Sequence, residues 1–491
     1  MRSSIKKIFN ESVKRYSKNI LLQEGMKQYS YEHIAEKVYQ QKKIWRQHGL
    51  QKRHRVILQY NNSKDLLVKI LACWDSDLVC VPMHPEAILD REKIEKIGPF
   101  LIDRRDTKPI FAYKNAYFRN PLLFPEEEEL GLIMMTSGTI SGVQKAVPLS
   151  HSNILSCIEG IQKMYPEEKI NESDSSFAFL PWYHIYGLVC ELLFLMSRGG
   201  KYHVAHRDET VHRFIYRMKY CNPSLLFTIP KFLETVHQKT ENAFLIPNHI
   251  LKRYIFGNRI RMISSGGGFL PDKVYDSIHK KLNIELYQGY GMTECSPMIS
   301  LETDSKCSLG NLLPEMKLRL NSIGEAEVSG KGLFHGYLGK NNKLIRPTDK
   351  FTNDGWFKTG DVLSISDNSD LHYEKRCGIE FKLTNGRFVD PILLEEILMK
   401  TGYFDCVVII PDKKYQKTIM TGILSKKGKK DEYYIIPKAN SELIHHNIEK
   451  YMLPSSFIPL TKPLDIRNET LTIKMEPNRH NIRNQVLQLH Q

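Results

Sequence analysis

The chain has 491 residues, more than one compact core accommodates, which predicts two or three domains. Hydrophobic residues make up 41% and charged residues 25%, as in a globular protein, and no apolar run reaches the roughly 18 residues of a membrane span. The net charge of +15 favours anionic substrates or anionic lipid surfaces, or is merely compositional. Because Lys and Arg are scattered, with no basic stripe carrying base-stacking aromatics, we expect no nucleic-acid partner.

Nine cysteines, an odd number without a Cys-x-x-Cys pair, indicate a reducing, cytoplasmic compartment without disulfides or a cysteine metal site. The N-terminus lacks the continuous apolar core of a signal peptide. Instead Ile5, Ile8, Phe9, Val13 and Tyr16 recur at helical spacing. They predict an amphipathic first helix that packs against the domain; peripheral attachment to a membrane is the alternative.

Over the first 380 residues, short apolar runs alternate with helix-like stretches, the pattern of parallel sheets with crossover helices. A strand at 55–60, a helix at 63–74 and a strand at 78–82 are examples. Later elements are shorter: strands at 381–383, 406–410 and 418–424, and helices at 391–399 and 442–452. We therefore expect an α/β protein with a large N-terminal domain of layered subdomains (1–376) and a small C-terminal α+β domain (377–491).

A segment rich in hydroxyls and glycines separates two apolar runs, 132–135 and 146–149, that predict strands. It begins Thr136-Ser137-Gly138-Thr139 and ends at Lys145, and such backbone N–H groups, hydroxyls and a cation suit a polyphosphate. It is not the P-loop of common NTPases, whose lysine follows a glycine directly and opens a helix. A plain Gly/Ser hairpin loop is the alternative. Ser150 and Asn153 after it are helix-capping residues.

Eight segments in fixed order resemble the adenylate-forming enzymes, which include acyl- and aryl-CoA synthetases, luciferases and the adenylation domains of peptide synthetases. In chain order they are 28–34, 136–145, 180–187, 222–233, 261–268, 287–294, 356–361 and 382–391. The most diagnostic is Tyr-Gln-Gly-Tyr-Gly-Met-Thr-Glu at 287–294. The segment 227–233 is similar to acyl-CoA synthetases and favours a fatty acid, and the absence of an acidic residue in 181–188 argues against an amino acid.

The resemblance implies that ATP and Mg²⁺ convert a carboxylic acid to an acyl-adenylate, with release of pyrophosphate. The acyl group then passes to the thiol of CoA, slightly favoured, or of acyl carrier protein. Because two anions must meet, the site must supply positive charge and fixed dipoles.

The resemblance also assigns a role to each matching residue. The residues that would hold the β- and γ-phosphates are Thr136, Ser137, Gly138, Thr139 and Lys145. Thr293 would contact the α-phosphate, and Glu294 would bind Mg²⁺. The residues around adenine would be Gly266, Gly267, Gly268 and Tyr290, with Gly291 in the same nucleotide pocket. Asp361 and Arg376 would hold the ribose hydroxyls. His184 lies where the family lines the carboxylate pocket, although a simply packed histidine is an equal alternative.

Three departures from the family pattern affect these expectations. The phosphate loop is one residue longer, with Gln144 where a proline is expected. Gly378 stands at the expected domain hinge, where glycine permits the rotation of a mobile C-terminal domain. Near the C-terminus, a strict register puts Glu476 where the family has its catalytic lysine, and the nearest lysine is Lys474. Our hypothesis is that Lys474 takes this role.

Two other interpretations of the function follow from that departure and from the choice of acceptor, CoA or carrier protein, which the sequence leaves undecided. One is a weakened or inactive relative that binds nucleotide or an acyl group as a partner domain. The other is a stand-alone adenylation unit that loads a carrier protein in secondary metabolism. The segment 471–479 separates the first reading from an active ligase.

Overall fold

The computed structural model describes residues 4–105, 109–110, 129–136, 145–204, 211–243, 245–304, 307–339, 343–366, 370–377, 381–412, 414–460, 463–465, 470–471 and 477–488. Its contacts divide the chain into two compact units. The larger comprises Met1–Thr136, Lys145–Thr359 and Leu363–Glu374, and the smaller consists mainly of Lys375–Gln491, with Gly360–Val362. The domain boundary at 376 stays a prediction.

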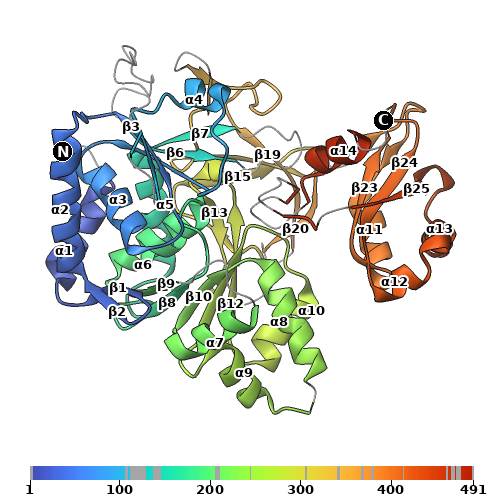
Figure 1. The fold of residues 1–491 in the computed structure, drawn as a ribbon, viewed down its shortest axis with the longest axis horizontal. Helices are drawn as coiled ribbons and strands as arrows, with labels where there is room; N and C mark the ends of the chain where they lie inside the picture. The colour runs from blue at the N-terminus through green and yellow to red at the C-terminus, as the bar shows by residue number, and fades with distance from the viewer. Residues whose placement is uncertain are drawn as a thin grey trace. The chain divides into compact units, whose positions relative to one another are not determined.

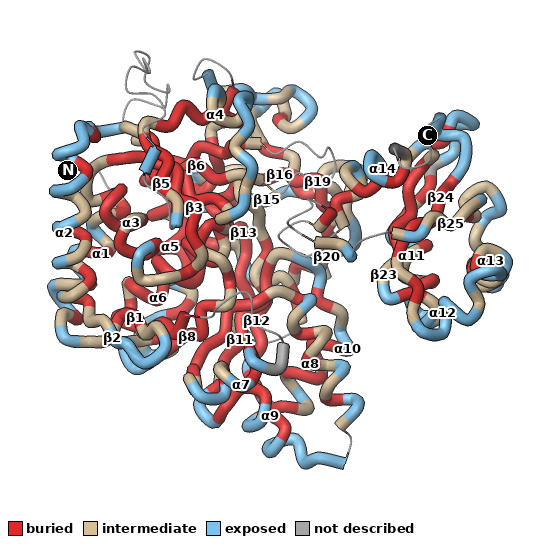
Figure 2. The backbone as a smooth tube through the Cα atoms, in the orientation of Figure 1, coloured by how far each residue is buried: buried red, intermediate tan, exposed pale blue. Residues whose placement is uncertain are grey.

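A nine-stranded mixed sheet is the centre of the larger unit (Figure 1). Its order is β14 (Asn311–Leu312), β13 (Met298–Leu301), β12 (Glu285–Gly291), β11 (Met262–Gly266), β10 (Leu225–Thr228), β8 (Ser175–Ala178), β9 (Lys201–Val204), β1 (Ile20–Glu24) and β2 (Lys27–Ser30). The strands from β12 to β1 pair in parallel, and the pairs at both edges are antiparallel. Strands β8, β10 and β11 are buried along their whole length, as expected for parallel strands covered on both faces (Figure 2).

A second, five-stranded sheet in the same unit has the order β5 (Leu101–Arg104), β3 (Arg55–Gln59), β4 (Val79–Met83), β6 (Leu130–Met135) and β7 (Ala146–Ser150). The strand–helix–strand pattern predicted for 55–82 is confirmed, because β3 and β4 are parallel and α3 (Lys64–Asp75) connects them. The capping prediction is also confirmed. The Ser150 hydroxyl accepts from the Asn153 amide at 3.0 Å, and Asn153 Oδ1 accepts from the Ser150 amide at 2.9 Å.

The helices of the larger unit cover these sheets. They are α1 (Lys6–Tyr16), α2 (Tyr31–Gln47), α3, α4 (Arg91–Ile97), α5 (His151–Met164), the π-helix η1 (Tyr186–Leu193), α6 (Phe194–Ser197), α7 (Val211–Cys221), α8 (Pro230–Asn242), α9 (Asn248–Phe256), α10 (Asp272–Asp276) and the π-helix η2 (Ser277–Lys281). In α1 the predicted apolar stripe packs inward, because Ile5, Phe9 and Tyr16 are buried. Packing against the domain, rather than attachment to a membrane, is therefore the use of that stripe.

Four smaller sheets make up the rest of the described β-structure. One contains β15 (Met316–Leu320), β16 (Glu325–Gly330), β19 (Phe357–Ile365) and β20 (Leu371–Arg376), and another pairs β17 (Tyr337–Leu338) with β18 (Leu344–Ile345). In the smaller unit β21 (Phe381–Lys382) pairs with β22 (Phe388–Val389), and β23 (Phe404–Pro411), β24 (Thr418–Leu424) and β25 (Pro454–Pro459) form a three-stranded sheet.

Helices pack on both faces of the three-stranded sheet. The helical segments of this unit are α11 (Pro391–Lys400), α12 (Lys426–Lys430), α13 (Ile435–His445), α14 (Arg479–Gln488) and two 3-10 turns, η5 (Glu432–Tyr434) and η6 (Lys450–Met452). The helix predicted at 442–452 is wrong in its bounds. The helix begins at Ile435, because Pro437 is tolerated in a first turn, and it ends before Asn447, whose φ is +58°.

A partly buried ion pair connects α14 to α11. Arg479 Nη2 donates to Glu395 Oε2 at 2.6 Å, and the Ile409 amide donates to Glu395 Oε1 at 2.6 Å. Burial raises the pKa of the Glu395 carboxyl, and Arg479 opposes that rise.

We expect Arg479→Met to lower the free energy of unfolding of the smaller unit by about 3 kcal/mol, because it leaves the Glu395 carboxylate, only 12% exposed, without its cation. The loss should shrink as the pH falls through the raised pKa of the unpaired Glu395 carboxyl, because the carboxyl then takes up a proton and loses its charge. Hydrogen exchange of the β23 amides measures both effects. The control is Lys438→Met, which breaks a more exposed pair with Asp431 at 2.7 Å and should cost less than about 1 kcal/mol. Equal losses in the two variants would contradict the prediction.

Candidate active site

The glycine turn (266–268) and the diagnostic segment 287–294 meet at the carboxyl ends of two neighbouring strands of the large sheet. Strand β11 ends at Gly266 and β12 at Gly291, and these parallel neighbours pair Gly266 with Gly289. Their carboxyl ends therefore present 266–268 and 290–294 side by side. In open α/β sheets, ligands bind at this edge of the strands.

Two glycines of the turn are favoured for different reasons. Gly267 has φ +85°, which disfavours any side chain, and no described atom lies within 4 Å of the place a Cβ would take. The open space there suits a flat ring. A Cβ on Gly266 would instead stand 3.2 Å from Cζ of Tyr186. The Tyr186 hydroxyl donates to the Ser264 carbonyl at 3.1 Å, and burial raises its pKa.

Gly291 and the residues after it form a tight backbone arrangement. A Cβ on Gly291 would lie 1.9 Å from the Pro297 carbonyl oxygen, so only glycine fits there. The 3-10 turn η3 (Thr293–Cys295) follows directly and carries the Thr293 and Glu294 side chains. This turn is held by the Phe334 amide, which donates to the Glu294 carbonyl at 2.8 Å. Glycine at 291 thus sets the position of the two polar residues.

A tyrosine that the sequence did not single out connects Glu294 with Lys145. The Tyr337 hydroxyl on β17 donates to Glu294 Oε1 at 2.8 Å, and Lys145 Nζ lies 4.6 Å from the centre of the Tyr337 ring. Burial and the neighbouring Glu294 charge raise the pKa of Tyr337, so its hydroxyl stays a donor. The Glu294 side chain is itself buried. The structure therefore gathers a carboxylate and an ammonium around one ring.

The two ends of the predicted phosphate loop are joined. The Lys145 amide donates to Thr136 Oγ1 at 3.0 Å, and the Thr136 amide donates to the Lys145 carbonyl at 2.9 Å. Strands β6 and β7, which lead into and out of the loop, pair in antiparallel fashion. Ser137, Gly138, Thr139 and Gln144 lie outside the described residues.

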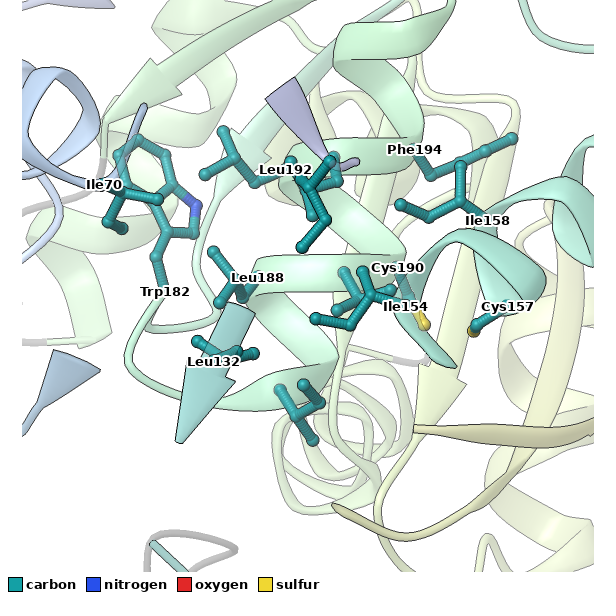
Figure 3. Close-up of a cluster of buried hydrophobic side chains, with 14 of the residues drawn as sticks. Ile70, Leu132, Ile154, Cys157, Ile158, Trp182, Leu188, Cys190, Leu192 and Phe194 are labelled. Atoms are coloured by element: carbon teal, nitrogen blue, oxygen red, sulfur yellow. The ribbon is translucent and has the colours of Figure 1, made fainter. Parts of the chain in front are cut away.

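His184 lies among aromatic rings. Its ring centre is 5.1 Å from that of Tyr183, which in turn meets His84 edge-on at 5.3 Å. The residues on both sides of His184 are anchored in the core, where Trp182, Leu188 and Leu192 pack with α3, β6 and α5 (Figure 3). The geometry fits a packed histidine, and contact with a carboxylate stays a prediction.

Asp361 and Arg376 are brought together on neighbouring strands, β19 and β20. Arg376 Nη1 lies 3.4 Å from Asp361 Oδ1, and the Asp361 side chain is buried. The nearby Cys377 amide donates to the Gly360 carbonyl at 2.6 Å. The pair expected to serve the same ribose is thus held as one unit, while Gly378 lies outside the described residues.

Lys474 and Glu476 also lie outside the described residues. On either side of them, Leu471 and Pro477 form an isolated antiparallel bridge, and the Asn478 amide donates to the Thr470 carbonyl at 2.9 Å.

Within the described ranges, no three His, Cys, Asp or Glu residues group as a metal site. The same part of the chain contains no helix with the length and apolarity needed to cross a bilayer.

Comparison with known proteins identifies the family. The model of the AMP-binding enzymes matches residues 88–338, more than half of the chain, and the chain belongs to this family. The long-chain-fatty-acid–CoA ligase 1 of Cavia porcellus is 25% identical over 323 residues, 56% of this chain and 45% of the relative. The 4-coumarate–CoA ligase 5 of Oryza sativa subsp. japonica is 27% identical over 301 residues, 57% of this chain and 52% of the relative. The chain thus spans about half the length of these relatives.

A solved structure shows the fold over nearly the whole length. The o-succinylbenzoate CoA synthetase of Bacillus subtilis, in complex with an acyl-adenylate intermediate, superimposes with a TM-score of 0.74 over 97% of both chains, at 18% identity. The predicted fold class, a large layered α/β part and a small α+β part, is confirmed.

Proposed function

We propose that the chain is an acid–thiol ligase that activates a carboxylic acid with ATP. A carboxylate oxygen attacks the α-phosphate, the bond to pyrophosphate breaks, and an acyl-adenylate forms. A thiol then attacks the acyl carbon, AMP leaves, and a thioester results. The observation that supports this most is the meeting of Lys145, Tyr337 and Glu294 beside the joined ends of the hydroxyl-rich loop.

The charges of this cluster suit a polyphosphate. Lys145 and the Thr136–Thr139 segment would hold the β- and γ-phosphates, and Thr293 would donate to the α-phosphate. The Glu294 oxygens fit Mg²⁺, a hard cation that takes carboxylate and phosphate ligands. The Tyr337 hydroxyl donates a hydrogen bond to Glu294 Oε1, and this bond fixes the orientation of the carboxylate. When bound, Mg²⁺ would neutralise part of the phosphate charge.

The glycine turn and the ion pair would bind the nucleoside. The open space over Gly267 suits adenine, with Gly266, Gly268, Tyr290 and Gly291 around it. Asp361 would accept hydrogen bonds from the ribose hydroxyls, and Arg376 would orient that carboxylate. His184 would line the carboxylate pocket.

A fatty acid is the substrate class that we favour. The segment 227–233 supports it, as does the name of the Cavia porcellus relative. The name of the rice relative points to an aromatic acid, which is the rival substrate class. CoA is our preferred acceptor because both relatives are named CoA ligases, and the phosphopantetheine thiol of acyl carrier protein is the alternative.

Glu476 supports a second candidate function, a relative that binds nucleotide or acyl groups without efficient catalysis. In the strict register it adds a third anion where two anions already meet.

One experiment tests the proposal and ranks its alternatives. The protein is incubated with ATP, Mg²⁺ and acids ranging from acetate through long-chain fatty acids to 4-coumarate, and acid-dependent pyrophosphate exchange is measured. We expect exchange with fatty acids, and a thioester after addition of CoA. Exchange with a thioester only on carrier protein would select the carrier-loading unit. ATP binding without exchange on any acid would support the binding relative and contradict the ligase.

A further inference from the structure

The helices α7 and α9 of the larger unit expose an unusual set of apolar side chains. They lie next to each other at the rim of that unit, on the side of β10 to β12 (Figure 1). The exposed residues are Tyr216 and Tyr220 on α7, Leu245 and Ile246 in the connection before α9, and Ile250 and Tyr254 on α9. Leu245 is 83% exposed and Tyr220 72% exposed, so these side chains project from the surface rather than fill a groove. We call this set the α7/α9 surface.

The opposite sides of both helices hold them firmly in place. Phe214 and Met218 of α7 and Leu251 and Ile255 of α9 pack in one buried cluster with strand residues that include Ile263. The exposed apolar residues are therefore not core residues displaced from their place. They form a second, exposed apolar row on helices that already bury one.

The segments that carry this apolar row are basic in sequence and contain no acidic residue. Residues 211–233 contain four Lys or Arg and residues 243–271 contain another four, with no Asp or Glu in either range. Lys219 Nζ lies 5.7 Å from the centre of the Tyr254 ring, so a cation of α7 lies next to an aromatic ring of α9 on this surface. The acidic residues of the neighbouring helix α8 are paired, Glu234 with Lys231 at 2.9 Å and Glu241 with Lys281 at 3.1 Å.

We propose that the α7/α9 surface docks the protein on an anionic phospholipid bilayer. Tyrosine rings prefer the interface of a bilayer, where the ring is buried and the hydroxyl stays in water. Projecting Leu245 and Ile246 would reach the boundary of the acyl chains, and Lys219 and Arg253 would face the phosphate headgroups. An acidic protein would also be attracted by the positive charges of this surface. The projecting aliphatic side chains Leu245 and Ile246 favour a lipid bilayer over such a protein, because they can insert between lipids.

This inference stands apart from the proposed reaction, because docking requires neither ATP nor a particular acid. Its test is sedimentation of the full chain with vesicles of phosphatidylcholine alone or mixed with phosphatidylglycerol. We expect binding to the anionic vesicles that weakens with salt. Lys219→Gln combined with Arg253→Gln should weaken it roughly 25-fold, about fivefold for each charge. Tyr216→Ser combined with Tyr254→Ser should also weaken binding to the anionic vesicles, although these substitutions leave the net charge of the protein unchanged.

The matched control lies on α2, where Tyr39 has the same 57% exposure as Tyr254 and Lys43 Nζ lies 4.6 Å from its ring centre. Lys43→Gln combined with Arg46→Gln removes one Lys and one Arg charge from a helix that also contains acidic Glu32 and Glu36, and should leave vesicle binding unchanged. Thermal unfolding checks that every variant is folded. Equal losses in both charge variants, or no vesicle binding by the unaltered protein, would overturn the proposal. Retention on polyglutamate without vesicle binding would assign the surface to an acidic protein instead.

Discussion

Glu294→Gln is expected to lower acid-dependent pyrophosphate release by roughly 10²–10³-fold, the cost of removing one electrostatic contact from such a site. The glutamine keeps the size of the side chain and still accepts the hydrogen bond from Tyr337, so the fold should be retained. What it loses is the negative charge that suits Mg²⁺. Initial rates of pyrophosphate release at increasing Mg²⁺ concentrations measure this effect, and a higher Mg²⁺ requirement should accompany the lower rate.

Tyr337→Phe is the informative comparison for this variant. It removes only the hydroxyl that directs Glu294, so the loss should be smaller, about tenfold, and largely recovered at high Mg²⁺. Tyr275→Phe is the matched control, because its hydroxyl donates to a backbone carbonyl, that of Leu286 at 3.1 Å. It should leave the Mg²⁺ dependence unchanged. Unaltered Mg²⁺ dependence in both Glu294→Gln and Tyr337→Phe would contradict the assignment of Glu294.

The sequence predicted those features whose causes are local. The strands on both sides of the phosphate loop and the cap formed by Ser150 and Asn153 depend on residues a few positions apart, and the structure confirms them. The glycines at 266, 267 and 291 were also visible as a pattern. The reasons for Gly266 and Gly291 were not visible, because they depend on Tyr186 and Pro297, which the fold brings against these two glycines.

Tyr337 shows what sequence reasoning missed and why. It lies 43 positions from Glu294 and still farther from Lys145, within a segment that matches none of the motifs considered. Its importance comes from the packing of β17 against β7, which places one ring beside both charges. Periodicity and composition do not encode such a contact. The helix predicted at 442–452 fails for a related reason, because the turn at Asn447 interrupts an apolar pattern that continues beyond it.

Under the proposed reaction, a positive charge from the C-terminal segment would determine whether adenylation is efficient. A lysine there would lie between the carboxylate and the α-phosphate, two groups that repel each other until a cation joins them. If Lys474 takes this role, Lys474→Ala should lower acid-dependent pyrophosphate release by roughly 10²–10³-fold. ATP binding should change little, because the phosphate loop and the glycine turn are untouched. Single-turnover pyrophosphate release at saturating ATP measures the chemical step.

Glu476 provides the control for this prediction. Glu476→Gln removes the competing anion, and under the Lys474 hypothesis it should keep or modestly raise the rate, because the carboxylate takes no part in the reaction. Unchanged turnover in Lys474→Ala, together with a large gain in Glu476→Lys, would reject the hypothesis. This result would place Glu476 at the position of the family's catalytic lysine. The chain would then be a relative with impaired adenylation, since the single substitution restores the missing cation.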